Sequence, residues 1–201
     1  DITIDGDNQS RVFNISSGSI ATLDALTITG GNTAASGGGI LNSGIVTVTN
    51  STLSGNEATY YGGGIDNTGT ATVINSTLSG NTAQYGGGIA NVATATVTNS
   101  TLSGNYASYG GGIAIINGGT AEVTNSTLSG NTAYSGGGGI DNYKGTATVT
   151  NSIVLGNNAG TDAEIAGTVT NTGNLSIIGG VNAADVFAAT TANGAGVLAD
   201  N

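Results

Sequence analysis

A short glycine-containing block recurs along this chain at nearly constant spacing, and this repeat limits the possible folds more than any other feature. Gly-Gly-Gly-Ile ends, at intervals of 25, 24, 24 and 27 residues, at Ile40, Ile65, Ile89, Ile113 and, with one extra Gly, Ile140. A second block, Asn-Ser-Thr-Leu-Ser-Gly-Asn, begins at Asn50, Asn75, Asn99 and Asn125, and a decayed copy begins at Asn151. A fixed period of this size indicates a stacked repeat architecture.

Each repeat also contains an alternating segment, such as Val46 to Thr49 or Ala95 to Thr98. Alternation of apolar and hydroxyl residues has period 2 and predicts strands with one buried face. Three short strands in about 24 to 27 residues fit one coil of a solenoid, whereas a propeller blade needs about 40 residues. The sequence therefore predicts an all-β, right-handed parallel β-helix of about seven coils, its hand following the general preference of parallel crossovers.

Three columns of apolar residues should form the core when the repeats are aligned. They consist of Leu53, Leu78, Leu102, Leu128 and Val154; of Val48, Val73, Val97, Val123 and Val149; and of the five Ile residues named above. Two columns of Asn should form ladders at corners: Asn32, Asn56, Asn81, Asn105, Asn131 and Asn157, and Asn50, Asn75, Asn99, Asn125 and Asn151. Stacked amides bond along the axis, and Asn tolerates the left-handed backbone of a sharp turn.

We expect one domain over residues 1–201. Residues 1–32 form an irregular opening coil, residues 33–157 the regular repeats, and residues 158–201 irregular coils. Within the last segment, residues 182–189 could form a capping helix, with Asn182 as N-cap and Phe187 covering the end of the solenoid.

Composition limits the partners. Only 7% of residues are charged, the net charge is -10, and there is no Cys or His. Such a chain should repel nucleic acid and anionic lipid surfaces. No apolar run approaches the roughly 18 residues that a membrane span requires, so we expect no membrane insertion of this segment.

The Gly-Gly-Gly-Ile and Leu-Ser-Gly-Asn blocks, over roughly residues 30 to 157, resemble the pectin-lyase-like β-helix repeats of large bacterial surface proteins, including those of the polymorphic outer-membrane protein type. The opening Ile2-Thr3-Ile4-Asp5-Gly6 looks like the coil that precedes such repeats. The resemblance implies an exported, adhesin-like chain that is extracellular or at a bacterial cell surface. It implies little about activity, because one solenoid carries lyases, hydrolases, adhesins and inert stalks.

Enzymatic activity is not expected. Asp66 and Asp141 occupy equivalent repeat positions but lie three coils apart, roughly 14 Å. An inverting pair of carboxylates needs about 6.5 to 9.5 Å. We expect no cofactor, although Ca²⁺ could bind near Asp5 and Asp7, or near Asp162 and Glu164; neither set matches the calcium pattern of β-roll repeats.

Two rows of side chains are candidate binding surfaces. A Tyr row precedes the Gly blocks and consists of Tyr61, Tyr85, Tyr109 and, offset by one residue, Tyr134. It could bind sugar rings, or it could be a self-packed ladder that shields a corner. An outward Thr grid contains Thr47, Thr72, Thr96 and Thr148 in one column and Thr49, Thr98, Thr124 and Thr150 in another. It resembles the face of ice-binding solenoids but is interrupted by Glu122 and Ile74.

The leading hypothesis is a non-enzymatic, adhesin-like or structural solenoid that binds surface glycans or a protein along a face, or assembles end to end with copies of itself. Ice binding through the Thr grid is the first alternative. A degenerate polysaccharide lyase or hydrolase is the second.

Overall fold

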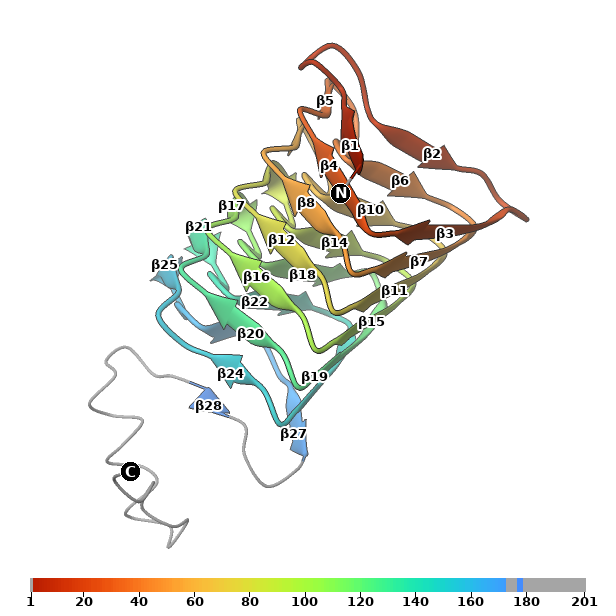
Figure 1. Cartoon of the computed structure of the whole chain (residues 1–201). Coiled ribbons are helices and arrows are strands. Elements are labelled where there is room, and N and C mark those ends of the chain that lie inside the picture. The colour runs from red at the N-terminus through yellow and green to blue at the C-terminus, as the bar shows by residue number, and fades with distance from the viewer. Residues whose placement is uncertain (1, 173–176, 179–201) are drawn as a thin grey trace, which may run out of the picture.

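The chain folds into a parallel β-solenoid of about seven coils, as the repeat predicts. A computed structural model describes residues 2–172 and 177–178. Within these residues the secondary structure consists of 28 strands and no helix, and every strand pairing is parallel. Figure 1 shows the coils stacked along one axis, with the three long sheets as the sides of the solenoid. The proposed helix at residues 182–189 lies outside the described residues.

Sheet A carries the Leu column. In spatial order it contains β1 (Ile2–Asp5), β4 (Leu26–Thr29), β8 (Thr52–Ser54), β12 (Thr77–Ser79), β16 (Thr101–Ser103), β20 (Thr127–Ser129), β24 (Ile153–Val154) and β28 (Ile177–Ile178). The pairing joins Leu53, Leu78, Leu102, Leu128 and Val154 in register, and all five are fully buried. The hydroxyl residues on either side of each Leu point outward because side chains alternate along a strand.

Sheet C is built from the alternating segments. Its strands, in chain order, are β3 (Ile20–Asp24), β7 (Ile45–Thr49), β11 (Thr70–Ile74), β15 (Thr94–Thr98), β19 (Thr120–Thr124), β23 (Thr146–Thr150) and β27 (Thr170–Thr172). The predicted Val column from Val48 to Val149 is buried in the core and in register.

Sheet B follows the Gly blocks. It contains β2 (Phe13–Ile15), β6 (Ile40–Asn42), β10 (Ile65–Asn67), β14 (Ile89–Asn91), β18 (Ile113–Ile116), β22 (Ile140–Tyr143) and β26 (Ile165–Ala166). The Ile column from Ile40 to Ile140 is fully buried, which confirms the third predicted core column.

A fourth, shorter ladder, sheet D, joins sheet A to the Gly blocks. It contains β5 (Asn32–Thr33), β9 (Glu57–Ala58), β13 (Thr82–Tyr85), β17 (Tyr106–Tyr109), β21 (Thr132–Gly136) and β25 (Asn158–Thr161). Its strands are two to five residues long, and the three strands expected per coil are those of sheets A, B and C. Sequence patterns miss sheet D because it has a single buried Ala per coil, such as Ala83 or Ala107.

The first Asn ladder is present and buried. The side-chain Nδ2 of Asn56, Asn81, Asn105 and Asn131 each donates to the Oδ1 of the ladder Asn in the next coil, over 2.8 to 3.0 Å. Asn32 was wrongly assigned to this ladder. It pairs with Glu57 in sheet D, and the backbone N–H of Gly31 donates to Asn56 instead.

The second Asn column supplies the corner between sheets C and A. All five of its residues have positive φ, between 46° and 51°, as a left-handed corner requires. Their side chains are exposed, so these residues shape the corner mainly through their backbone conformation. The ladder at this corner is formed by the adjacent buried Ser residues: the N–H of Ser51 donates to the Oγ of Ser76, and that of Ser76 to Ser100.

Glycine triplets form the corner between sheets D and B. The first Gly of a triplet has positive φ, as at Gly86 and Gly110. The second and third leave no room for a side chain: a Cβ on Gly111 would lie 2.5 Å from the carbonyl oxygen of Gly138. Close coil-to-coil approach of the backbone therefore dictates these residues.

Candidate functional site

Three of the four Tyr residues in the predicted row form a stack on the outside of the solenoid. The ring centroids of Tyr61 and Tyr85 are 5.2 Å apart, as are those of Tyr85 and Tyr109, with interplanar angles of 23° and 11°. Burial, followed by the neighbouring Tyr109 and Tyr61 hydroxyls, raises the pKa of Tyr85. Inside this stack the ring faces contact each other, so that these faces are closed to a ligand.

Tyr134 does not continue the stack. A register shift in sheet D pairs Tyr109 with Gly136. Tyr134 stands 76% exposed, and among the described residues it forms no ring contact with the stack. The additional glycine in this repeat moves the strand along by one position, which explains the offset seen in the sequence.

Sheet B also has an outward column that contains two carboxyl groups. In register, this column consists of Asn14, Leu41, Asp66, Ala90, Ala114, Asp141 and Ala166. Ala90 and Ala114 are almost completely buried although they point away from the core. Other parts of the chain therefore cover the middle of this column.

Two carboxyl groups flank the covered part of this column. Burial raises the pKa of Asp66 to about 6, and the positive charge of Arg11 partly opposes that effect. Burial raises the pKa of Asp141 to about 6 as well, and the nearby charge of Asp162 adds to it. The strand register places Asp66 and Asp141 three pairings apart, which corresponds to roughly 14 Å and is too far for concerted acid and base catalysis.

The predicted Thr grid is present on the outside of sheet C. The register aligns Thr47, Thr72 and Thr96, and then Glu122 and Thr148, in one column. Ile74 interrupts the second column, which also contains Thr49, Thr98, Thr124 and Thr150. Each of these Thr residues is partly exposed.

Sheet A carries a second hydroxyl surface that the sequence analysis did not identify. Its outward columns are Thr52, Thr77, Thr101 and Thr127, and Ser54, Ser79, Ser103 and Ser129. The signal was present in the sequence, because Thr-Leu-Ser occurs in four successive repeats without an exception. Only the central Leu of that tripeptide belongs to a predicted core column.

The carboxylates proposed as calcium ligands do not form a cluster, and two of them already accept hydrogen bonds within the chain. Asp5 accepts a hydrogen bond from the N–H of Asp7, a local turn contact of 2.8 Å. Glu164 is buried and accepts from the backbone N–H groups of Gly156 and Asn157 and from the Nδ2 of Asn157. Within the described part of the chain, no group of three or more acidic side chains is arranged to hold a metal ion.

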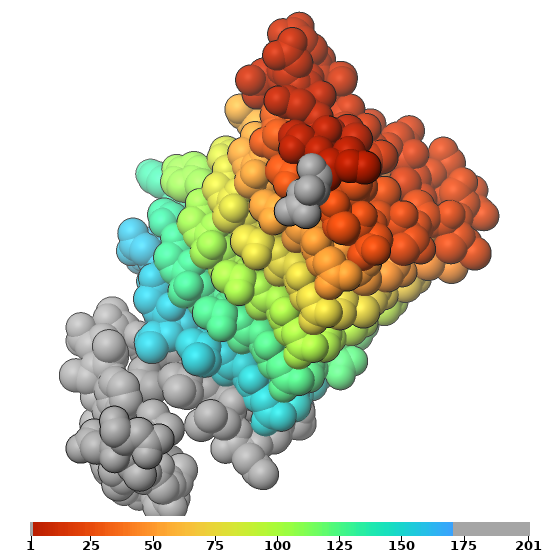
Figure 2. Space-filling view, viewed as in Figure 1, coloured from red at the N-terminus to blue at the C-terminus, as the bar shows by residue number. Residues whose placement is uncertain are grey.

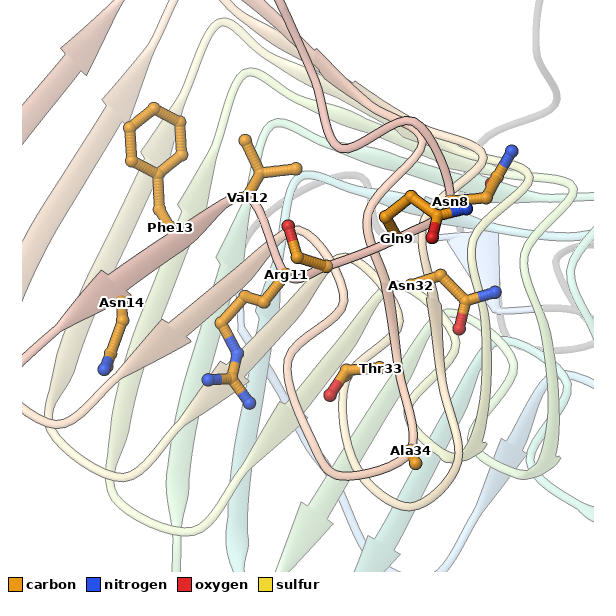
Figure 3. Close-up of a pocket in the computed structure, with 10 residues that line it drawn as sticks. Asn8, Gln9, Arg11, Val12, Phe13, Asn14, Asn32, Thr33 and Ala34 are labelled. Carbon is orange, nitrogen blue, oxygen red and sulfur yellow. The ribbon is translucent and has the colours of Figure 1, made fainter.

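A pocket of about 580 Å³ lies at the N-terminal rim, a size typical of small-molecule sites. Its lining consists of Asn8, Gln9, Ser10, Arg11, Val12, Phe13, Asn14, Asn32, Thr33 and Ala34. Figure 3 shows Phe13 and Asn14 pointing to opposite sides of β2. The Nε of Arg11 donates to the carbonyl oxygens of Ser36 and Gly37, so that its guanidinium group fastens the first coil to the second. Arg11 was not predicted as a site residue, although it is one of only two basic residues in the chain.

A scan of protein-family models and searches of curated proteins and of solved structures gave no match to this chain. The parallel β-solenoid is therefore established by the structure itself. In the part of the chain that the structure describes, no helix is long and apolar enough to cross a membrane.

Proposed function

We propose that this chain is a non-enzymatic β-solenoid of an exported or cell-surface protein, and that it presents a repeated outer face to a glycan or protein partner. The observation that best supports this function is the register of the outward hydroxyl columns. Thr77, Thr101 and Thr127, for example, follow one another in sheet A at every coil. A repeated face of this kind suits a repeated partner, because many weak contacts add when they are held on one scaffold.

The interior of the solenoid is suited to holding such a face rigidly. Buried amides bond continuously from Asn56 to Asn157, and the buried Ser ladder runs beside them. Each side chain in these ladders is fixed by both neighbouring coils. Local bending would therefore break several buried hydrogen bonds at once, and leaving a buried polar group unpaired costs about 1 to 3 kcal/mol.

The surface chemistry favours partners of low charge. Sheets A and C expose mainly hydroxyl groups, which donate and accept hydrogen bonds but carry no charge. The net charge of -10 opposes polyanions such as nucleic acid or acidic polysaccharides. Neutral glycans and uncharged protein surfaces are therefore the preferred partner classes.

A surface-adhesion assay tests this function. The chain would be coupled to beads, and adhesion would be measured on immobilised neutral glycans and on whole cells. Thr77→Lys with Thr101→Lys places charges on sheet A, and Thr72→Lys with Thr96→Lys places matched charges on sheet C. We expect adhesion by the unaltered chain and loss of most of it in only one of these variants. Absence of adhesion, equal loss in both variants, or cleavage of the glycan would contradict the proposal.

Ice binding is a second candidate, favoured by one observation: seven strands of sheet C stay in register, and Thr fills most positions of two outward columns. Glu122 stands exposed in the middle of this surface. If the Thr grid binds ice, the chain should lower the freezing point below the melting point, and Glu122→Thr should strengthen the effect. Freezing and melting at one temperature for both proteins would exclude this function.

A further inference from the structure

The pocket at the N-terminal rim lies where the first coil takes a shorter path than the second, at the corner between sheets D and B. The N–H of Asn32 donates to the carbonyl oxygen of Ser10, and the N–H of Val12 donates to that of Gly38. These two bonds align the first coil with the second. Between them the first coil has only Arg11, whereas the second coil makes a longer excursion. The pocket, which residues of both coils line, therefore lies beside a segment of the second coil that the first coil does not cover.

The uncovered segment contains the outer edge of β5, the first strand of sheet D. On its other edge β5 pairs with β9, and the N–H of Thr59 donates to the carbonyl oxygen of Thr33 there. By contrast, the carbonyl oxygen of Asn32 and the N–H of Ala34 have no hydrogen-bond partner in the part of the chain that the structure describes. Both residues line the pocket. An extended backbone placed along this edge could bond to both groups, as a further strand of the sheet would.

Arg11 holds a positive charge at the far end of this edge. Its Nε donates to the carbonyl oxygens of Ser36 and Gly37, which follow β5 along the chain, so that the guanidinium group is fixed in place. Its Nη1 has no hydrogen-bond partner among the described residues. Figure 3 shows the side chains of Arg11 and Asn14 on one side of β2 and the Phe13 ring on the other. The guanidinium group therefore has donors left for an anion.

The lining of the pocket is suited to a ligand that combines one negative charge with neutral polar groups. Arg11 is the only charged residue among the 10 that line it. Asp66, whose charge interacts with that of Arg11, is only 6% exposed and does not belong to the lining. Four carboxamides of the lining form no side-chain hydrogen bond within the described residues: Asn8, Gln9, Asn14 and Asn32. A carboxamide offers both a donor and an acceptor, and so matches a peptide group.

We propose that this pocket binds the C-terminal end of an extended peptide, with the terminal carboxylate on the guanidinium group of Arg11. The peptide would pair with the edge of β5 in parallel orientation, as the neighbouring strands of sheet D do. A parallel peptide runs from Asn32 toward Ser36, so that its carboxylate reaches the positive charge and accepts charge-assisted hydrogen bonds. An antiparallel peptide would bring its ammonium group there instead. This site lies at one end of the solenoid and does not depend on the repeated outer faces of the proposed function.

The test compares two forms of one peptide: N-acetyl-trialanine with a free carboxylate, and the same peptide with a C-terminal amide. Binding to the whole, isotope-labelled chain would be followed by NMR shifts of backbone amides at neutral pH. We expect the free acid to shift the N–H of Ala34 and to bind at least about tenfold more tightly than the amide, which corresponds to about 1.4 kcal/mol. Inorganic phosphate at the same concentration should not displace it. Equal binding of both peptides, displacement by phosphate, or shifts that spare Ala34 would overturn the proposal.

Variants locate the site. Arg11→Gln removes the charge and should lower the affinity for the free acid to that for the amide. Asn14→Asp adds a carboxylate to the lining without removing the hydrogen bonds of Arg11; it should have the same effect and serves as the second variant if Arg11→Gln does not fold. Asn158→Asp is the matched control, because Asn158 is exposed in β25, near the other end. A preference for the free acid that survives in folded Arg11→Gln or Asn14→Asp, or that is lost in Asn158→Asp, would refute the assignment.

Discussion

At the scale of single residues, the burial and the contacts of a side chain in this solenoid depend on its column more than on its neighbours in sequence. Asp66 shows this dependence most clearly. Its register partners are Leu41 on one side and Ala90 on the other, so that a carboxyl group occupies an apolar column and is only 6% exposed. Desolvation disfavours the charged form of such a group.

Asp66 should therefore make stability fall as the pH rises. Its pKa in the folded chain is about 6, compared with 3.8 without burial, so that the folded state holds the proton more tightly. The stabilising contribution is complete below pH 3.8 and is lost as the pH rises through about 6. Asp66→Asn should raise stability by about 2 to 3 kcal/mol at pH 7, at about 1.4 kcal/mol per pKa unit, and change little at pH 4.

Thermal unfolding between pH 4 and 7 measures this effect. Asp24→Asn is a control of opposite sign, because hydrogen bonds from Thr49 and Asn50 lower the pKa of Asp24. That variant should melt at a lower temperature than the parent chain at pH 7. If the melting temperatures of the parent chain and Asp66→Asn changed equally with pH, burial of Asp66 would have no energetic consequence. Burial also raises the pKa of Asp141 to about 6. The loss of stability with rising pH should therefore be smaller in Asp66→Asn than in the parent chain, but still present.

At the scale of elements, corners and ladders define the coil. The side-chain hydrogen bonds of the Asn ladder all have the same direction, because each Nδ2 donates to the Asn of the following coil. The last amide, that of Asn157, meets the carboxylate of Glu164 at 2.7 Å. A carboxylate is suited to this position because it accepts several bonds and needs no acceptor for itself.

Replacing Glu164 should open the C-terminal end of the ladder. Glu164→Ala leaves three donors, on Gly156 and Asn157, without their partner and should lower stability by about 2 to 5 kcal/mol. Amide hydrogen exchange should increase first in β24 and β25. Glu57→Ala, in the exposed part of β9, is the control and should change stability by less than about 0.5 kcal/mol. Similar effects of the two substitutions would show that Glu164 does not terminate the ladder.

The Gly corner yields a second prediction at this scale. Gly111→Ala should destabilise strongly, by about 3 kcal/mol or more, because its Cβ would lie 2.5 Å from the Gly138 carbonyl oxygen and 2.6 Å from that of Thr132. Gly136→Ala should be nearly neutral, since its Cβ has room. Urea unfolding of the two variants measures the difference. Equal midpoints would mean that coil spacing adapts easily at this corner.

At the scale of the whole molecule, the N-terminal end presents a set of edge strands. β1, β2, β3 and β5 are the first strands of their sheets. Figure 2 shows successive coils as bands of colour that end on this side in the red first coil. Ile2 is 64% and Ile20 is 77% exposed on two of these edges. Exposed, apolar edge strands promote pairing with other chains.

Self-association through the N-terminal edge strands should weaken when a charged side chain is placed on one of them. Ile20→Lys should weaken self-association at least about tenfold, because a charged Lys on an edge strand opposes pairing with another chain. Light scattering after size-exclusion chromatography, over a range of concentrations, measures the change. Ile153→Lys is the control, since Ile153 is also exposed but lies in β24, near the other end. The same association in both variants would show that the N-terminal edges are not the contact.

The sequence by itself determined the strands of sheets A, B and C, the coil length, the three core columns and the left-handed Asn corners, because each follows from local alternation or from a repeat of fixed period. Only the tertiary structure decided what depends on register between coils. It placed Asn32 outside the ladder and Gly136 opposite Tyr109. It also added the short sheet D and the ladder in which Asn42 donates to Asn67 and Asn67 to Asn91. A shift of one residue changes the partner of every side chain in a strand, and a single sequence does not specify where such shifts fall.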